Sequence, residues 1–332
     1  MGQFIDHDIT LDVTSSLNRV NDPQATENFR TPALDLDCLY GDGPEASPHL
    51  YYQSDQTIPG GPVYEGISIL EGTAGKDLPR NSENRALIGD PRNDENPVVS
   101  QLQLAFIKFH NAVVRRLKAD GVPEGKLFEE TREAVRWHYQ WIVLQDFLPR
   151  IVGRRAVNDL LANGRRFYRP KMQAFVPIEF AGAAYRFGHT QVPGIINYNA
   201  DHQDINLFDP SLGAVFSANL AGPIDWASFF GPQATKARPV DTKLAATLLD
   251  LPFIKTGEKS LATRNLLRGQ SFRLPSGQVV HDHMERVLDR KLREPQIPSI
   301  TGSLFDGLQP SILKEAAPLW FYILAEGGLN QG

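Results

Sequence analysis

The chain opens with the stretch Met1-Gly-Gln-Phe-Ile-Asp-His-Asp-Ile-Thr10, in which two carboxylates flank a histidine among apolar side chains. If this stretch forms a helical turn, successive side chains step by about 100° around its axis. Gln3 and His7 then share one face, with Asp6 beside them, and Asp8 points to nearly the opposite side. One turn of helix would therefore serve two sites. A polar, solvated stretch is the simpler interpretation of these ten residues alone, so the rest of the chain has to decide.

The composition is that of a globular protein. The chain has 332 residues, 41% of them hydrophobic, and a net charge of −5, which is enough for one large or two ordinary domains with a packed core. It has no cluster of basic and aromatic residues of the kind that binds nucleic acid. No apolar run reaches the roughly 18–20 residues that cross a bilayer. No secretory signal is visible, and the single cysteine, Cys38, suits a reducing compartment or a bacterial source, so the localisation is left open.

The hydrophobic pattern predicts a mainly α protein with long loops and little sheet. A first helix is predicted over 98–118, where apolar residues recur at spacings of three and four, namely Leu102, Phe106, Phe109, Val113 and Leu117. A second is predicted from Phe128 to about Phe147, with Val135, Trp141, Ile142 and Leu148 packing inward and Pro149 ending it. A third is predicted over 309–325.

Four histidines outside the first turn have a simpler interpretation than catalysis. His110 and His138 lie on the first two predicted helices, where a buried, hydrogen-bonded structural role is the more common one. His281 and His283 are two residues apart and would diverge on a helix, which argues against a metal site there.

Two loop segments carry candidate sites. Residues 11–97 are rich in Pro, Gly, Asn and Asp, and a loop of that length usually has a function or a ligand to hold it. Within it, Asp35 and Asp37 follow Thr31 in an arrangement that suits an oxygen cage for a hard cation, although an acidic turn would look the same. Arg92 and Glu95 lie on a turn just ahead of the first predicted helix, where a surface salt bridge is the alternative.

A further histidine stands beside a cation. Tyr185-Arg-Phe-Gly-His189-Thr190 places Arg186 three residues before His189, on the same helical face. Asn265 and Arg268 have the same spacing in a later segment. Two imidazoles, several cations and an amide are the groups that a peroxidase haem pocket uses, but no spacing rule makes the combination unique.

Seven segments occur together in one order. They are Gly-Gln-Phe-Ile-Asp-His-Asp at 2–8, Thr-Pro-Ala-Leu-Asp-Leu-Asp-Cys-Leu-Tyr-Gly at 31–41, Gly-Asp-Pro-Arg-Asn-Asp-Glu at 89–95, Phe-His-Asn at 109–111, Asp-Phe-Leu-Pro at 146–149, Tyr-Arg-Phe-Gly-His-Thr at 185–190 and Asn-Leu-Leu-Arg-Gly at 265–269. On these segments the chain resembles the animal-type haem peroxidases of the peroxidase–cyclooxygenase superfamily, which includes myeloperoxidase and lactoperoxidase, and it looks closest to their bacterial members. The resemblance implies a myeloperoxidase-like fold and a single catalytic domain over 1–332, shortened at both ends.

The resemblance implies haem b as the cofactor and gives the central residues their roles. His7 is the distal histidine, Arg92 the distal arginine, and Gln3 lines the distal cavity. His189 is the proximal ligand of the haem iron, and Asn265 accepts its ring N–H.

The remaining haem contacts are implied in the same way. Arg186 and Arg268 lie near the propionates, and Asp6 and Glu95 match the carboxylates that form ester bonds to the haem in the mammalian enzymes. Whether these esters form here is left open. Asn96 replaces the methionine that makes a third link in myeloperoxidase, so that link cannot form.

A calcium site is also implied, made by Asp8, Thr31, Ala33 through its carbonyl, Asp35 and Asp37. Asp37 stands where the mammalian site has a serine, and the additional carboxylate should favour calcium affinity. The cation would then hold the turn that carries His7.

The implied function is reduction of hydrogen peroxide with oxidation of a small organic donor or a halide, as in a response to oxidative stress. Neutral His7 would take a proton from one peroxide oxygen and deliver it to the other. Arg92 would stabilise the negative charge that develops as the O–O bond breaks.

Two alternatives belong to other classes of function. The fatty-acid dioxygenases of the same superfamily use a tyrosine three residues before the proximal histidine, but Arg186 occupies that position and Tyr185 lies one residue earlier. A calcium- and haem-binding module without turnover is the second alternative. The presence of both histidines and of Arg92 argues against it.

Overall fold

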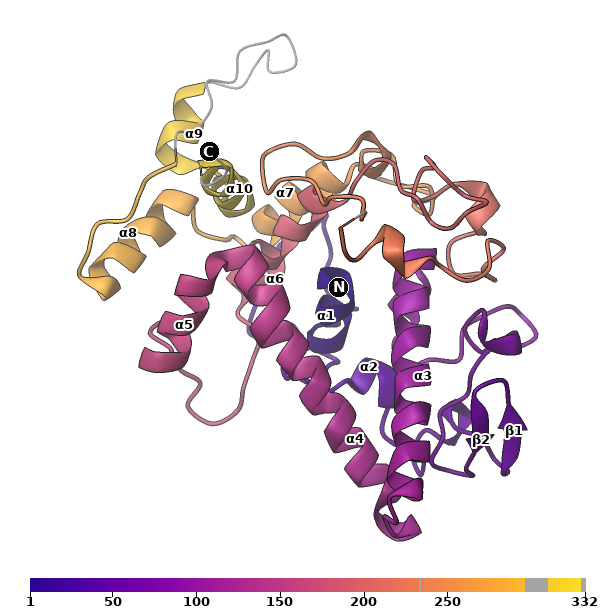
Figure 1. The fold of residues 1–332 in the computed structure, drawn as a ribbon. Helices are drawn as coiled ribbons and strands as arrows, with labels where there is room; N and C mark the ends of the chain where they lie inside the picture. Colours follow the sequence, from indigo (N-terminus) through magenta and orange to yellow (C-terminus); the bar gives the residue numbers. More distant parts are fainter. Residues whose placement is uncertain (233, 296–309, 330–332) are drawn as a thin grey trace. The chain divides into compact units, whose positions relative to one another are not determined.

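The computed structural model describes residues 1–232, 234–295 and 310–329, most of whose regular structure is helical (Figure 1). These residues form two compact units. The first unit comprises Met1–Leu11, Arg30–Gly164 and Ile195–Thr235, and the second comprises Asp12–Phe29, Arg165–Gly194 and Lys236–Gly332. The single catalytic domain expected from the sequence stays a prediction. No helix in the described ranges is both long enough and apolar enough to cross a membrane.

The first unit is built around two long helices, α3 (Pro97–Ala119) and α4 (Glu124–Trp141), which pack against each other. Figure 1 shows them meeting at their shared loop and spreading apart, with the short helices α1 (Gly2–Ile9) and α2 (Asp37–Tyr40) between them. Phe4 of α1 stacks on Phe106 of α3 with ring centres 5.0 Å apart, so aromatic packing holds α1 against α3.

The sheet is small, as the sequence predicted. Strands β1 (Gln56–Ile58) and β2 (Gly61–Val63) form an antiparallel pair, with Ile58 opposite Gly61. Short 3₁₀ turns lie within the loops of each unit. They are η1 (Pro48–Leu50), η2 (Thr73–Gly75), η3 (Pro91–Asp94), η7 (Pro210–Leu212), η8 (Trp226–Ser228) and η9 (Ala246–Leu248). The fold is therefore mainly α with long loops, and that prediction is confirmed.

The helix predicted over 98–118 is confirmed, but its buried face differs from the predicted one. Of the predicted apolar stripe only Phe106 is buried, and the other four members are partly exposed. The buried face instead carries several polar side chains, and its residues include Gln103, Phe106, Ile107, His110, Asn111 and Val114. A rule that counts only apolar residues cannot find this face, because buried amides and a histidine form part of it.

The second helix differs from its prediction at both its face and its end. Trp141 is 62% exposed, and the buried face runs instead through Leu127, Thr131, Val135 and Tyr139. Pro149 does not end the helical path, which continues through the π-helical segments η4 (Ile142–Phe147) and η5 (Pro149–Gly153) and ends at Gly153, whose φ of 83° separates it from α5 (Arg154–Asn163). A π-helical turn is wider than an α-helical one, which leaves room for the proline ring that an α-helical turn would exclude.

The second unit contains α6 (Ile178–Gly182), the 3₁₀ segment η6 (Ala184–Gln191), α7 (Leu261–Ser271) and α8 (Gly277–Leu288). The single helix predicted over 309–325 is wrong: α9 (Pro310–Ala316) and α10 (Leu319–Leu329) are separate, and residue 309 lies outside the described residues. Pro318 separates them, because it has no N–H for an internal helical bond. Leu319, Trp320 and Leu324 of α10 form the core of this unit with Ala183.

Candidate active site

The first ten residues form the helix that the sequence suggested, and its side chains point in different directions. His7 and Asp8 are both buried, whereas Gln3 is exposed and Asp6 is partly exposed. Thr10 ends the helix and donates its hydroxyl to the Asp6 carboxylate at 3.1 Å. The two buried side chains reach separate sets of partners: His7 reaches Asn93, and Asp8 reaches the carboxylates of Asp35 and Asp37.

His7 meets a buried amide. Its Nδ1 lies 2.7 Å from Oδ1 of Asn93, which is in turn hydrogen-bonded through Nδ2 to Oε1 of Gln103 at 2.8 Å. Burial lowers the pKa of His7, and the positive charge of Arg92 lowers it further, while the Asp6 carboxylate opposes both. A neutral imidazole is therefore favoured, which is the form that can accept a proton.

Arg92 is held by a buried acid. Its Nε and one terminal nitrogen donate to the two oxygens of Asp90, at 3.0 and 2.7 Å, and the same terminal nitrogen donates to the carbonyls of His7 and Thr10. Asp90 also accepts from Nε of Arg30 at 2.9 Å. The arginine thus binds the last turn of α1 and keeps its charge close to His7.

Gln3, Glu95 and Asn96 form a small polar group beside this pair. Asn96 caps α3 by accepting the N–H of Val99, and its Nδ2 donates to Oε1 of Gln3 at 2.9 Å. Gln3 in turn donates to Glu95 at 3.3 Å. Burial raises the pKa of Glu95 to about 7, against the lowering effect of Arg92 and with a further rise from Asp6. Asn96, noted in the sequence only as a departure, therefore positions Gln3.

The carboxylate of Asp8 on α1 lies close to those of Asp35 and Asp37, which the sequence grouped with it. Asp8, Asp35 and Asp37 offer oxygens that all lie within 4.8 Å of one another. Thr31 belongs to the same group, since its hydroxyl donates to Asp35 at 2.7 Å and its N–H to Asp37 at 3.2 Å. Ala33 lies exposed in the same loop.

Asp8 is the most unusual member of this group, since its side chain is 0% exposed. In the described part of the chain neither of its oxygens has a hydrogen bond of normal geometry, although the Tyr139 hydroxyl and the Cys38 thiol lie close enough to lower its pKa. Burial outweighs them and, with the charges of Asp37 and Asp35, raises the pKa of Asp8 to about 8. A buried carboxylate aimed at two others is what a bound cation would stabilise.

In the second unit, His189 lies on η6 and meets Asn265 of α7. Nδ1 of the ring is 2.9 Å from Nδ2 of the amide, and the amide oxygen accepts from Arg186 at 3.3 Å. The expected contact is present, but its direction is the reverse of the expectation: the amide presents its nitrogen to His189, because the guanidinium holds the oxygen. Burial lowers the pKa of His189 to about 3, and Arg186 adds to this effect.

Arg268 has an acidic partner within its own unit. Its guanidinium lies 3.8 Å from the Asp12 carboxylate and donates to the hydroxyl of Ser15. The pair is partly exposed, with 18% of the arginine side chain and 30% of the aspartate side chain accessible. Neither Asp12 nor Ser15 was singled out from the sequence.

The structural histidines behave as the sequence suggested, with one exception. His110 is buried and bonded to the Tyr40 hydroxyl and to the carbonyl of Ile67. His281 is buried while His283 is exposed, so the two side chains diverge as the sequence predicted. His138 is exposed, its ring bonded to the carbonyl of Ala134 in its own helix.

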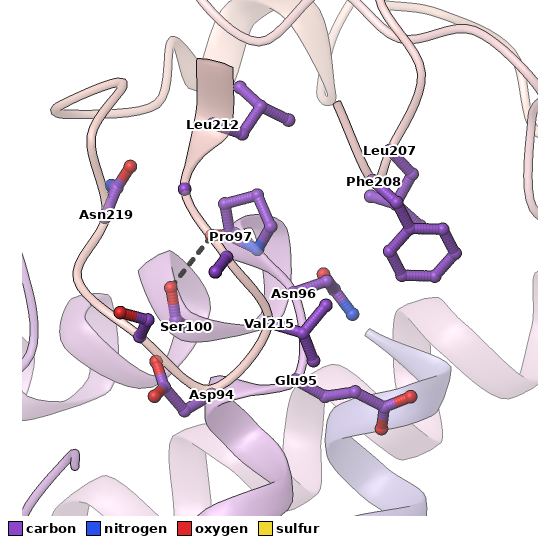
Figure 2. A pocket seen from close by; sticks show the side chains of 13 residues that line it. Asp94, Glu95, Asn96, Pro97, Ser100, Leu207, Phe208, Leu212, Val215 and Asn219 are labelled. Carbon is purple, nitrogen blue, oxygen red and sulfur yellow. Dashed lines mark hydrogen bonds between the residues drawn. The ribbon is translucent and has the colours of Figure 1, made fainter. Parts of the chain in front are cut away.

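A small hollow lies at the start of α3 (Figure 2). Polar side chains of Asn96, Ser100 and Asn219 and apolar side chains of Leu207, Phe208, Leu212 and Val215 line it. Figure 2 also shows the Glu95 carboxylate pointing away from Ser100 and Asn219. The hollow has room for only about one or two water molecules.

A histidine oriented by an amide, as His189 is by Asn265, is an arrangement that iron-binding histidines use. The model of the family described as "Animal haem peroxidase" matches residues 14–276, which is more than half of the chain. The chain therefore belongs to the animal haem peroxidase family. The matched range contains Arg92, His189 and Asn265, whereas α1 with His7 precedes it.

Curated relatives and solved structures agree with this assignment. The chain is 30% identical to the Peroxidasin homolog pxn-1 of Caenorhabditis elegans over 57% of its own length, and 30% identical to the thyroid peroxidase of Canis lupus familiaris over 57%. It spans only 16% and 21% of these two relatives.

In fold, the chain is similar to Peroxidase A from Dictyostelium discoideum, with 16% identity, a TM-score of 0.56 and coverage of 97% of this chain and 71% of that one. It is also similar to the fatty acid alpha-dioxygenase of Oryza sativa, with 15% identity, a TM-score of 0.59 and coverage of 98% and 62%. These structures belong to the peroxidase–cyclooxygenase fold, and the fold expected from the sequence is confirmed.

Proposed function

We propose that this chain is a haem-dependent peroxidase that reduces hydrogen peroxide and oxidises small organic donors or halides. The observation that carries the proposal is the pairing of His7 with Arg92. A buried imidazole whose pKa is lowered stands beside a guanidinium fixed by a buried carboxylate. A neutral base next to a fixed positive charge is the arrangement that peroxide cleavage requires.

His189 is the residue we assign to the haem iron. Its lowered pKa keeps the imidazole neutral at physiological pH, as metal binding requires. Binding through Nε2 places the ring proton on Nδ1, so Asn265 must then turn its oxygen toward the ring. Release of Arg186 from that oxygen to a haem propionate would allow this, and Arg268 is the second cation for a propionate. The bound iron would supply the electrons and the open coordination position for peroxide.

His7 and Arg92 carry the protein's part of the reaction. His7 takes the proton from the near oxygen of hydrogen peroxide and returns it to the far oxygen, which leaves as water. Arg92 stabilises the negative charge on the departing oxygen, and because Asp90 already holds the guanidinium, little reorganisation is needed. We assign Gln3 to the wall of the same cavity.

The carboxylates of the site have two proposed roles. We assign Asp6 and Glu95 as candidates for ester links to haem, and a pKa of about 7 leaves Glu95 partly protonated at neutral pH. Asp8, Thr31, Asp35, Asp37 and the Ala33 carbonyl are proposed to bind calcium, which prefers six to eight oxygen ligands. The Asp8 carboxylate supports this assignment, because it is buried beside two other carboxylates and has no hydrogen bond of normal geometry within the described residues.

The test is reconstitution of the full chain with haem, followed by measurement of its absorbance spectrum and of peroxide-dependent dye oxidation. We expect a Soret band and turnover. His7→Ala should keep the Soret band and lower the rate of reaction with peroxide by about 10²–10⁴-fold. His138→Ala, which changes an exposed histidine of α4, should leave both unchanged.

The outcomes separate the alternatives. The absence of a Soret band would contradict the proposal, and a Soret band without turnover would favour a non-catalytic haem- and calcium-binding module. Acid denaturation of the haem-loaded protein tests the ester links, because covalently attached haem stays with the chain. The bacterial affiliation suggested by the sequence and the response to oxidative stress stay predictions.

A fatty-acid dioxygenase is the second candidate, favoured by the similarity to the alpha-dioxygenase fold. The position three residues before His189 is occupied by Arg186, which cannot form the tyrosyl radical expected of that group. Oxygen uptake with an unsaturated fatty acid, measured beside dye oxidation, decides between the two activities.

A further inference from the structure

We infer that two buried amides, Asn93 and Gln103, fix the ring proton of neutral His7 on Nδ1 and leave Nε2 as the nitrogen that accepts a proton. The geometric part of this inference is independent of haem. Its catalytic meaning rests on the proposed function, in which His7 acts as a base. Neither amide belongs to the set of site residues expected from the sequence.

The carbonyl of Cys38 determines which atoms donate and which accept in this chain of hydrogen bonds. Helix α2 has only one turn: Gly41 donates its N–H to the carbonyl of Asp37, and the N–H of Asp42 goes to the hydroxyl of Ser47. The Cys38 carbonyl is thus left beyond the helical ladder and accepts from Nε2 of Gln103 at 3.3 Å. A carbonyl can only accept, so Gln103 must present its nitrogen to it.

The two amides then transmit this direction. With its nitrogen committed, Gln103 presents Oε1 to Asn93, which donates from Nδ2 at 2.8 Å. With that nitrogen committed, Asn93 presents Oδ1 to His7 at 2.7 Å. An oxygen at this distance from Nδ1 requires a proton on Nδ1. In the neutral ring the proton is then absent from Nε2.

Burial makes the direction costly to reverse. Asn93 is 0% exposed and Gln103 is 1% exposed, so water cannot replace a lost bond at either amide. Turning both amides over would set the oxygen of Gln103 against the Cys38 carbonyl, two acceptors facing each other. Only a rearrangement of α2 would remove that conflict.

Close packing holds the Cys38 carbonyl in place. Gly89 lies against α2 so closely that a Cβ at this position would be 2.6 Å from the carbonyl oxygens of Asp37 and Cys38. Any side chain there would push the carbonyl that starts the chain of bonds. The ends of this chain, Cys38 and His7, are each next in sequence to a member of the carboxylate cluster, Asp37 and Asp8.

The tautomer is the quantity to measure. We would label the histidines with ¹⁵N and record the ring nitrogen signals of the full chain without porphyrin and with zinc protoporphyrin, a diamagnetic analogue of haem. The His7 signals are identified by their loss in His7→Gln. We expect the Nδ1–H tautomer in wild type in both samples, and a dominant Nε2–H tautomer in wild type would overturn the inference.

Substitutions then test the two amides as positioning residues. Asn93→Leu and Gln103→Leu should both increase the Nε2–H population, and in the haem-loaded protein both should lower the rate of reaction with peroxide by at least about tenfold. An orienting group that leaves an imidazole in the wrong tautomer can lower turnover by about 10⁴-fold.

The matched control lies two residues away on the same helix. Gln101 is also buried, donates to the carbonyl of Lys76 at 2.9 Å and accepts the N–H of Ile224, but it does not reach His7. Gln101→Leu should leave the His7 tautomer unchanged. An equal effect of Gln101→Leu and Gln103→Leu would mean general loosening of the fold and would contradict the inference.

Failure of the proposed function would look different. If the chain bound no porphyrin and had no peroxidase activity, the sample without porphyrin would still report the tautomer. Peroxidase activity with an Nε2–H tautomer of His7 would leave the proposed function standing and remove the role of the two amides.

Discussion

Each of the two units places an asparagine against a histidine, and the two amides point in opposite directions. Asn93 presents its oxygen to His7 at 2.7 Å, whereas Asn265 presents its nitrogen to His189 at 2.9 Å. The difference lies in the group at the far side of each amide. Asn93 is bonded to an amide whose own nitrogen is committed to a carbonyl, and Asn265 is bonded to the guanidinium of Arg186. The partner that cannot change its hydrogen-bonding role decides the direction.

The acidic partners of the arginines differ in the same way. Asp90 has a fully buried side chain and binds both Arg30 and Arg92 at hydrogen-bonding distance. Asp12 is 30% exposed and lies 3.8 Å from Arg268. The first unit therefore holds Arg30 and Arg92 in a closed network around Asp90, while the second holds Arg268 in a looser, partly exposed pair.

The largest expected effect comes from breaking the closed network. Asp90→Asn removes the buried carboxylate that Arg30 and Arg92 share, although Arg30 keeps its contact with Asp37 at 3.7 Å, and we expect it to lower the free energy of unfolding by about 3 kcal/mol. Asp12→Asn removes a partly exposed pair and should lower it by less than about 1 kcal/mol. Urea unfolding of the two variants beside wild type measures both changes.

Equal losses in the two variants would show that the burial of Asp90 has no energetic consequence and that the comparison is wrong. Asp42→Asn, on the exposed loop after α2, serves as a control for the substitution itself and should change the free energy of unfolding by less than about 0.5 kcal/mol.

The sequence predicted those features that depend on neighbouring residues. The helical turn that separates His7 from Asp8 follows from a spacing of one residue, and the acidic loop at Asp35 and Asp37 is a local pattern. The partner of His189 was also expected, although 76 residues separate it from Asn265, because the family resemblance supplied it.

The features that the sequence missed depend on contacts between distant segments. Gln103 and Cys38 are 65 residues apart, and the direction of their bond follows from where α2 ends. Asn93 and Asp90 lie inside a segment that the resemblance included, yet only the fold shows that one reaches His7 and the other Arg92. The reversed amide at Asn265 was missed because the guanidinium that sets its direction was assigned to the propionates.

The second prediction concerns the carboxylate cluster of the first unit. In the calcium-free protein, burial and the neighbouring carboxylates raise the pKa of Asp8 to about 8, and burial raises the pKa of Asp37 to about 6. A carboxyl whose pKa is higher in the folded state than in the unfolded chain costs stability when it becomes ionised. The calcium-free fold should therefore lose stability as pH rises from about 4, the ordinary value, to about 8.

Calcium should remove this loss, because it stabilises the ionised carboxylates. At the same calcium concentration, the increase in Tm should thus be larger at pH 8 than at pH 5. Where the calcium concentration is 100 times Kd, the added stability should be about 2.7 kcal/mol. Asp8→Asn should raise the Tm of the calcium-free protein at pH 8 and abolish most of the calcium response. Thermal unfolding with chelator and with calcium, at both pH values, measures these changes. A calcium response that is unchanged in Asp8→Asn would exclude Asp8 as a ligand.

The smallest expected effect tests the direction of the amide at His189. Asn265→Asp supplies only acceptors, so its carboxylate can bind Arg186 and the Nδ1–H of His189 together, and haem affinity should be retained. Asn265→Leu leaves the ring without an orienting partner and should weaken haem binding by about 10–100-fold, the usual effect of losing such a partner. Haem titration followed at the Soret band measures both. If Asn265→Leu bound haem as tightly as wild type, the amide would have no part in orienting His189, and only the amide at His7 would act as a directing group.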